Sequence, residues 1–196
     1  MSNTESTKST KSTKYDLLVL YSGGADSTIL LKLAERAGRN PIALMIDYGQ
    51  KHVDELKYAK EFLDKNKIKN IIIKISGFDV NSALTGSGEK GIYEGVDIHN
   101  VPGRNSIFLS LAYGIAESRG IQEIWFGANW EDYEHLFPDC TQEYIGRMNK
   151  VLEVAAVRPI KIYAPLLGMQ KDLIMELLLD YKIGKEEVYS GYGEFK

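Results

Sequence analysis

The stretch Leu17-Leu18-Val19-Leu20-Tyr21-Ser22-Gly23-Gly24-Ala25-Asp26-Ser27-Thr28 decides the fold of this chain. Its first part is an unbroken apolar run, which predicts a strand buried on both faces, as in parallel sheets. The paired glycines end that strand, and an amphipathic helix pattern follows, which Gly38 is placed to close. A strand, a glycine turn and a helix N-terminus together present unpaired backbone N–H groups to an anion.

Two common phosphate-binding patterns are absent from this turn. No G-x-G-x-x-G follows the strand, and no Gly-Lys-Ser/Thr follows the glycines. The residues from Ser22 to Ser27 resemble the S-G-G-x-D-S signature of the PP-loop ATP pyrophosphatases. The resemblance implies that the loop holds the pyrophosphate of ATP while a substrate oxygen attacks the α-phosphorus. The plainer alternative is an ordinary strand-to-helix turn, with Asp26 as a first-turn charge favoured by the helix dipole.

Composition and charge exclude several classes of function. Of the 196 residues, 44% are hydrophobic and 26% are charged, which is typical of a soluble globular protein. The net charge of −3 argues against a broad nucleic-acid-binding surface, and no apolar run approaches the ~20 residues of a membrane span. The single cysteine excludes an intrachain disulfide and any metal site made only of cysteines. These features indicate a cytoplasmic enzyme with no membrane partner and no stable nucleic-acid partner.

The chain divides into a leader and one domain. Residues 1–14 repeat Ser-Thr-Lys and offer no apolar side chain after Met1, so we expect them to be disordered. Residues 15–196 are expected to form a single domain around the glycine loop. In this domain strand patterns alternate with helix patterns, and the expected elements are strands near 17–21, 42–46, 70–75, 123–127 and 160–163 and helices near 29–37, 52–65, 106–119, 142–155 and 169–181.

This alternation predicts an α/β fold, a doubly wound and mainly parallel sheet of about five strands with helices on both faces. Ligands bind such sheets beyond the carboxyl ends of the strands, where the strand order reverses. Residues 76–100 show no period and are expected to form a long loop.

Other segments near the strand ends carry polar residues with two interpretations. Before the third long helix, Pro102-Gly103 is a turn and Asn105 an N-cap, or Arg104 holds a phosphate or carboxylate. Both interpretations stay open on the residues alone. Farther on, the lone Cys140 fits a buried small hydrophobe better than a nucleophile.

Taken together, these segments resemble the 7-cyano-7-deazaguanine synthase (QueC) family within the PP-loop superfamily. The resemblance runs from about Tyr15 to Tyr192. The matching segments, in chain order, are Ser22–Ser27, Tyr48–His52 with Glu55, Val101–Asn105, Gly127 with Asp132, Pro138–Cys140, and Pro165-Leu166 with Lys171.

The resemblance implies that ATP activates 7-carboxy-7-deazaguanine by adenylation and that ammonia displaces AMP to give an amide. A second ATP then activates the amide oxygen, and loss of AMP leaves the nitrile, for 7-deazaguanine modification of nucleic acid. Four alternatives stay open: an enzyme that stops at 7-amido-7-deazaguanine, a PP-loop enzyme that modifies tRNA, a nucleotide-binding subunit without turnover, and an enzyme that amidates a different carboxylate.

The resemblance also implies roles for individual residues. Asp26, Arg104 and Lys171 are the expected catalytic residues, with Mg²⁺ accompanying ATP. The residues expected to hold ATP form the loop and its flanks, namely Tyr21, Ser22, Gly23, Gly24, Ala25, Asp26, Ser27 and Thr28. The residues expected on the side of the deazaguanine and ammonia are Gln50, His52, Asn105, Asp132 and Asp139.

One segment departs from the family pattern. The family usually ends in Ser-Cys-Tyr-Asn-Gly and a cysteine cluster that binds structural zinc, whereas this chain reads Ser190-Gly191-Tyr192-Gly193. Because Cys140 is the only thiol and His52, His99 and His135 do not supply a ligand spacing, no structural zinc and no resident metal site are expected. A homodimer is a candidate assembly, although the residues that form dimer contacts in relatives belong to this departing region.

Overall fold

The computed structural model describes residues 15–50, 54–77, 101–134, 137–184 and 187–188. The expected leader, His52, most of the long loop expected at 76–100 and the segment Ser190–Gly193 lie outside the described residues. Within the described ranges, no helix is both long enough and apolar enough to cross a membrane.

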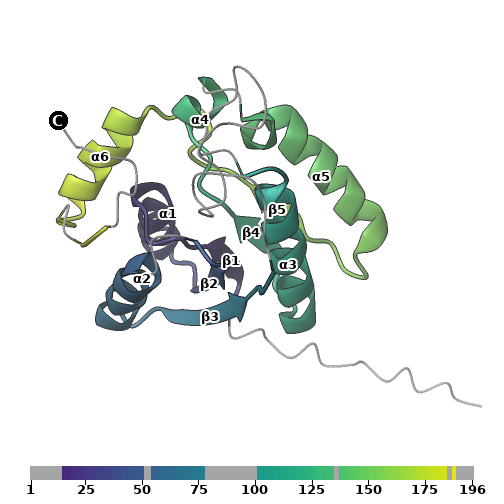
Figure 1. Cartoon of the computed structure of the whole chain (residues 1–196), viewed down its shortest axis with the longest axis horizontal. Helices are drawn as coiled ribbons and strands as arrows, with labels where there is room; N and C mark the ends of the chain where they lie inside the picture. Colours follow the sequence, from purple (N-terminus) through teal and green to yellow (C-terminus); the bar gives the residue numbers. More distant parts are fainter. Residues whose placement is uncertain (1–14, 51–53, 78–100, 135–136, 185–186, 189–196) are drawn as a thin grey trace, which may run out of the picture.

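The centre of the molecule is a parallel sheet with the strand order β3-β2-β1-β4-β5 (Figure 1). Leu18 of the central strand pairs with Ile42 on one side and with Ile124 on the other. The strands are β1 (Leu17–Leu20), β2 (Pro41–Asp47), β3 (Lys69–Lys74), β4 (Glu123–Trp125) and β5 (Lys161–Tyr163). Every pairing is parallel, which confirms the predicted class of sheet.

Helices cover both faces of this sheet, as Figure 1 shows. Side chains alternate along β1, so Leu17 and Val19 enter one apolar core and Leu18 enters the other. The first core is shared with α1 (Ala25–Arg36), α2 (Asp54–Lys65) and α6 (Lys171–Asp180). The second is shared with α3 (Arg104–Arg119) and α5 (Gln142–Ala155). The doubly wound arrangement predicted from the alternating pattern is therefore confirmed.

Glycines follow the ends of two helices, and one of them, Gly38, is the residue that the sequence predicts there. Gly38 follows α1 with φ +70°, and Gly120 caps α3 with φ +71°. The prediction of Asn105 as an N-cap is wrong, because Gly103 is the N-cap and α3 already begins at Arg104. Gly103 takes a left-handed conformation that the adjoining turn requires, and this leaves the Asn105 side chain available for another contact.

The described residues between β4 and α5 include short helical turns that their sequence does not suggest. They contain α4 (Trp130–Glu134) and a 3₁₀ turn, η1 (Pro138–Cys140), where the sequence predicts only a loop. Helices this short have too few residues to show a helical period.

The sheet reverses its order between β1 and β4, because β2 lies on one side of β1 and β4 on the other. The segments that leave these two strands come close together. A Cβ atom at Gly127 would lie 3.0 Å from Asp26 Cβ and 3.3 Å from Ser27 N, so only glycine suits this approach without a shift. A site at the switch point therefore draws residues from both segments.

Candidate functional site

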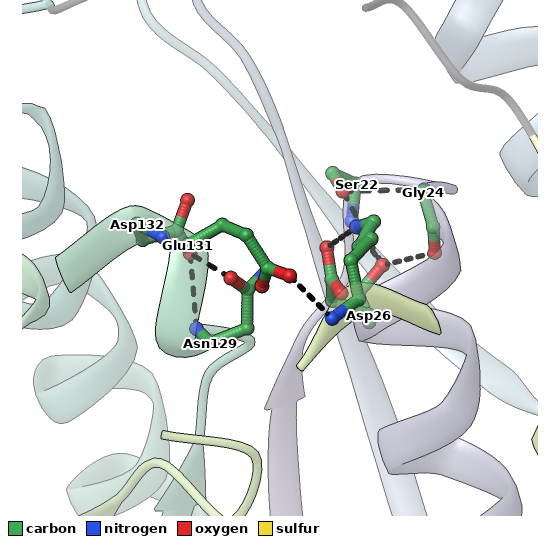
Figure 2. Close-up of polar contacts among 8 residues, drawn as sticks. Ser22, Gly24, Asp26, Asn129, Glu131 and Asp132 are labelled. Atoms are coloured by element: carbon green, nitrogen blue, oxygen red, sulfur yellow. Dashed lines mark hydrogen bonds and ion pairs between the residues drawn. The ribbon is translucent and has the colours of Figure 1, made fainter. Parts of the chain in front are cut away.

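The loop between β1 and α1 is held in one conformation by local contacts. Gly23 has φ +88°, and a Cβ atom there would lie 2.7 Å from Ala59 Cβ of α2. Ser27 Oγ accepts a hydrogen bond from Ser22 N at 3.2 Å and donates one to Gly24 O at 3.1 Å. Ser22 Oγ accepts from Gly24 N at 3.3 Å (Figure 2). The two hydroxyls thus hold the bend that the glycine makes possible.

The helix that follows this loop offers backbone donors. The first hydrogen bond within α1 runs from Thr28 N to Gly24 O at 3.0 Å, so the N–H groups of residues 25–27 precede the helical ladder. These donors and the helix dipole make the turn suitable for an anion.

Tyr21 and Thr28 lie behind the loop. Both are buried, and the Thr28 hydroxyl donates to Tyr21 Oη at 3.5 Å. Burial raises the pKa of Tyr21 to about 12, so its hydroxyl stays protonated. Their position suits support of the loop from the core.

A lysine from the last helix reaches this loop. Lys171 Nζ donates to Asp26 Oδ2 at 2.6 Å, and the lysine backbone N–H donates to Glu131 Oε1 at 2.7 Å. The other oxygen of Asp26, Oδ1, is buried and has no hydrogen-bond partner within the described residues. Figure 2 shows Ser22, Gly24 and Asp26 facing the segment of Asn129, Glu131 and Asp132.

Asp132 is held opposite the loop by a reciprocal pair of hydrogen bonds. Asn129 N donates to Asp132 Oδ2 at 3.0 Å, and Asp132 N donates to Asn129 Oδ1 at 3.1 Å. The pKa of Asp132 is raised to about 6, chiefly by burial and also by the charge of Asp26. The Asn129 N–H and the cations Lys171 and Arg104 act in the opposite direction on this pKa. Asp132 is therefore close enough to all three charged residues to respond to them.

The start of α3 supplies the remaining polar groups. Arg104 Nη1 donates to Tyr48 Oη at 3.5 Å, and Asn105 Nδ2 donates to Cys140 Sγ at 3.4 Å. Burial, followed by the carboxylates of Asp132 and Asp139, raises the pKa of the Cys140 thiol well above its usual range. The thiol is buried and neutral, as a small hydrophobe would be, and it is not activated as a nucleophile.

The expected residues fall into groups by position. Asp26, Lys171, Asp132 and Arg104 share one electrostatic environment, and Asp139 joins it through the Cys140 thiol, which contacts Asp139 Oδ1 at 3.8 Å. Gln50 is buried at the end of β2, where its Oε1 accepts from Tyr48 N at 3.1 Å.

Asn129 and Glu131 are site residues that the sequence does not reveal as such. The spacing of Asn129 and Asp132 resembles a reciprocal cap, a signal that could have indicated their pairing. Glu131 bonds a residue 40 positions away, and no local pattern indicates such a contact.

Comparison with known proteins gives the family. The family model described as Queuosine biosynthesis protein QueC matches residues 16–196. A 7-cyano-7-deazaguanine synthase 1 from Colwellia psychrerythraea is 35% identical over 178 residues, covering 84% of this chain and 80% of the relative. A 7-cyano-7-deazaguanine synthase from Marinobacter nauticus is 38% identical over 176 residues, covering 84% of this chain and 79% of the relative.

Solved structures agree on the fold. The U34-tRNA thiolase NcsA from Methanococcus maripaludis matches with a TM-score of 0.59 and 17% identity, over 94% of this chain and 63% of its own. An NH₃-dependent NAD synthetase from Campylobacter jejuni matches with a TM-score of 0.56 and 16% identity, over 94% of this chain and 72% of its own. These likenesses show a shared architecture, and the family model together with the curated relatives shows that the chain belongs to the QueC family.

Proposed function

We propose that this chain is a carbon–nitrogen ligase that converts 7-carboxy-7-deazaguanine and ammonia to 7-cyano-7-deazaguanine with ATP, in the cytoplasm. The names of the curated relatives support this reaction. The observation that carries it is the pairing, across the switch point, of a loop suited to an anion with a cation and a partly buried carboxylate. The nitrile would serve 7-deazaguanine modification of nucleic acid.

The first step would be adenylation. A substrate carboxylate oxygen attacks the α-phosphorus of ATP, an oxygen–phosphorus bond forms, and pyrophosphate leaves. The carboxylate is already a nucleophile, so the step needs positioning and charge neutralisation more than a base. The N–H groups of residues 25–27 would bind the departing pyrophosphate, while Lys171 and Arg104 would offset the remaining negative charge.

The second step would form the amide. Ammonia attacks the activated carbonyl carbon, and AMP leaves with the oxygen that it received from the carboxylate. Asp132 would accept the proton that the attacking nitrogen loses, since its pKa of about 6 leaves it ionised at neutral pH. Asn105, Asp139, Gln50 and His52 are the residues we assign to the deazaguanine side.

The nitrile requires a second activation. The amide oxygen attacks the α-phosphorus of another ATP, and pyrophosphate leaves again. Loss of two protons from the nitrogen and departure of AMP then give the carbon–nitrogen triple bond.

Magnesium fits this site as an ion that arrives with ATP. Mg²⁺ is usually held by one or two carboxylates together with substrate phosphates. Asp26 offers a buried oxygen without a partner among the described residues, and no group of three or more potential ligands occurs there. Asp26 would therefore hold the ion, which would neutralise charge on the phosphates.

The test is product analysis. Purified protein is incubated with 7-carboxy-7-deazaguanine, ammonium and ATP, and the product is identified by mass spectrometry while AMP is counted. The proposal expects the nitrile and two AMP for each substrate consumed. Accumulation of the amide with one AMP would refute the second activation, and turnover only after addition of tRNA would refute the free base as substrate.

A further inference from the structure

The first turn of α6 is held by side chains and backbone of the segment after β4. Gln170 occupies the N-cap position of α6, and its own side chain makes no capping bond within the described part of the chain. Lys171 N instead donates to Glu131 Oε1 at 2.7 Å, and Trp130 N donates to Met169 O at 3.1 Å. Two hydrogen bonds thus fasten α4 to the start of α6.

This attachment matters because Lys171 is also the residue that reaches the loop. Its Nζ donates to Asp26 Oδ2 at 2.6 Å, while 40% of its side chain is exposed to solvent. A long and half-exposed lysine side chain has many rotamers, so the position of its ammonium depends on where its backbone is fixed. Glu131 fixes that backbone through its bond to Lys171 N, and Figure 2 shows the Glu131 side chain extended towards Asp26.

We propose that Glu131 is a positioning residue, which holds the first turn of α6 so that the Lys171 ammonium stands at the phosphate-binding loop. This inference rests on the proposed function, in which Lys171 offsets charge on the phosphates. Glu131 acts through the lysine backbone and contributes no group to the reacting atoms. Its carboxylate also stands at a helix N-terminus, where a negative charge is favourable.

A residue that merely stabilised the fold would affect the activity of the Lys171 variants differently. Loss of a structural contact lowers activity by the same factor whatever residue stands at position 171. Loss of a contact that acts through the lysine has no further effect once the lysine is gone. A double-mutant cycle separates these cases.

The experiment measures kcat and KM for ATP, by pyrophosphate release, in Glu131→Met, Lys171→Ala and the double variant. Glu131→Met keeps the length of the side chain and removes the acceptor. We expect it to lower kcat/KM by about 10-fold or more, towards the ~100-fold of a misplaced reacting group. In the Lys171→Ala background the same change should cost less than about 2-fold.

Three further variants complete the test. Glu131→Gln keeps an acceptor oxygen and should retain activity within about 3-fold. Asp172→Asn removes a neighbouring, exposed negative charge from the first turn of α6 and should leave activity unchanged. Glu131→Ala is measured in the same double-mutant cycle and replaces Glu131→Met if Glu131→Met does not fold.

The outcomes distinguish this inference from the proposed function. If the unaltered protein makes no product from 7-carboxy-7-deazaguanine, the proposed function fails. If it does, the positioning role is overturned by full activity in Glu131→Met, by an equal loss in the Lys171→Ala background, or by a loss in Glu131→Gln as large as in Glu131→Met.

Discussion

The loop after β1 and the segment after β4 face each other across the switch point, and they offer different groups to a ligand. The loop is held by bonds between near neighbours, such as Ser22 N to Ser27 Oγ, and it offers backbone N–H groups. The facing segment offers carboxylates, one of which bonds a residue 40 positions farther along.

This difference suggests separate roles for the loop and for the segment after β4. A bend held by its own glycine and hydroxyls is fixed before any ligand arrives, which suits a constant anion such as pyrophosphate. The pKa of a partly buried carboxylate depends on neighbouring charges, so Asp132 can respond to pH and to substrate. Substitutions in the loop should therefore abolish activity, whereas substitutions in the segment after β4 should reduce activity or change its pH dependence.

The largest effect is expected from Gly23→Ala. The new Cβ would lie 2.7 Å from Ala59 Cβ at a backbone φ of +88°, so the loop would have to move. Pyrophosphate release should fall by about 1,000-fold or more, since several donors to the phosphates would be displaced together. Gly38→Ala is the matched control, because Gly38 has φ +70° but its Cβ position is open. Equal losses in the two variants would show that backbone strain alone explains the effect.

Arg104→Ala is expected to have the next largest effect. Loss of a cation that offsets developing charge costs about 100-fold in kcat. The exposed Arg147 on α5, which pairs with Glu143, provides a control that should change kcat by less than about 2-fold. Unchanged turnover in Arg104→Ala would remove this residue from the proposed mechanism.

Asp132→Asn should separate activity from stability. The pKa of Asp132 rises from 3.8 to about 6 on folding, so the folded state binds the proton more tightly. Ionisation of Asp132 therefore lowers the free energy of unfolding as pH rises from about 4 to about 6. The neutral amide avoids this loss and should raise the free energy of unfolding at pH 7 by on the order of 1–2 kcal/mol.

The same variant should turn over more slowly, by about 10-fold to 100-fold, because it lacks the proton acceptor. In the unaltered protein, kcat should fall as pH drops below about 6 at constant free ammonia. The kcat of the variant should not show this fall. Denaturant unfolding and the pH profile provide the two measurements. An Asp132→Asn variant that is less stable, and whose kcat still falls below about pH 6, would contradict both the raised pKa of Asp132 and its role as proton acceptor.

Cys140→Ala should have the smallest effect. The thiol is buried and neutral, so its removal should leave kcat within about 3-fold and lower the free energy of unfolding by about 1 kcal/mol. A loss of activity by about 100-fold or more without unfolding would indicate a chemical role for the thiol.

Sequence and structure agree where the signal is contiguous. The buried strand, the glycine bend and the helix from Ala25 onward follow from neighbouring residues, and the alternating pattern predicts the sheet. The convergence of Arg104, Asp132 and Lys171 with the loop was expected only from the rule that ligands bind at strand ends and from the family resemblance.

Other features could not be predicted because they depend on contacts between distant segments. The helix α4 is too short to show a period, and Glu131 reaches Lys171 only after the sheet has formed. The pKa of Asp132 depends chiefly on burial, and the burial of a side chain cannot be inferred from its neighbours in the sequence. Asparagine is a residue type that favours the N-cap, yet Gly103 takes that position in place of Asn105 because the turn needs a left-handed residue.

A crystal structure with a non-hydrolysable ATP analogue and 7-carboxy-7-deazaguanine would test the role of the glycine loop directly. We predict the β- and γ-phosphates within hydrogen-bond distance of the N–H groups of residues 25–27, with the Lys171 ammonium beside them. Phosphates bound elsewhere, with the bend at Gly23 and Gly24 in contact with solvent alone, would refute that role.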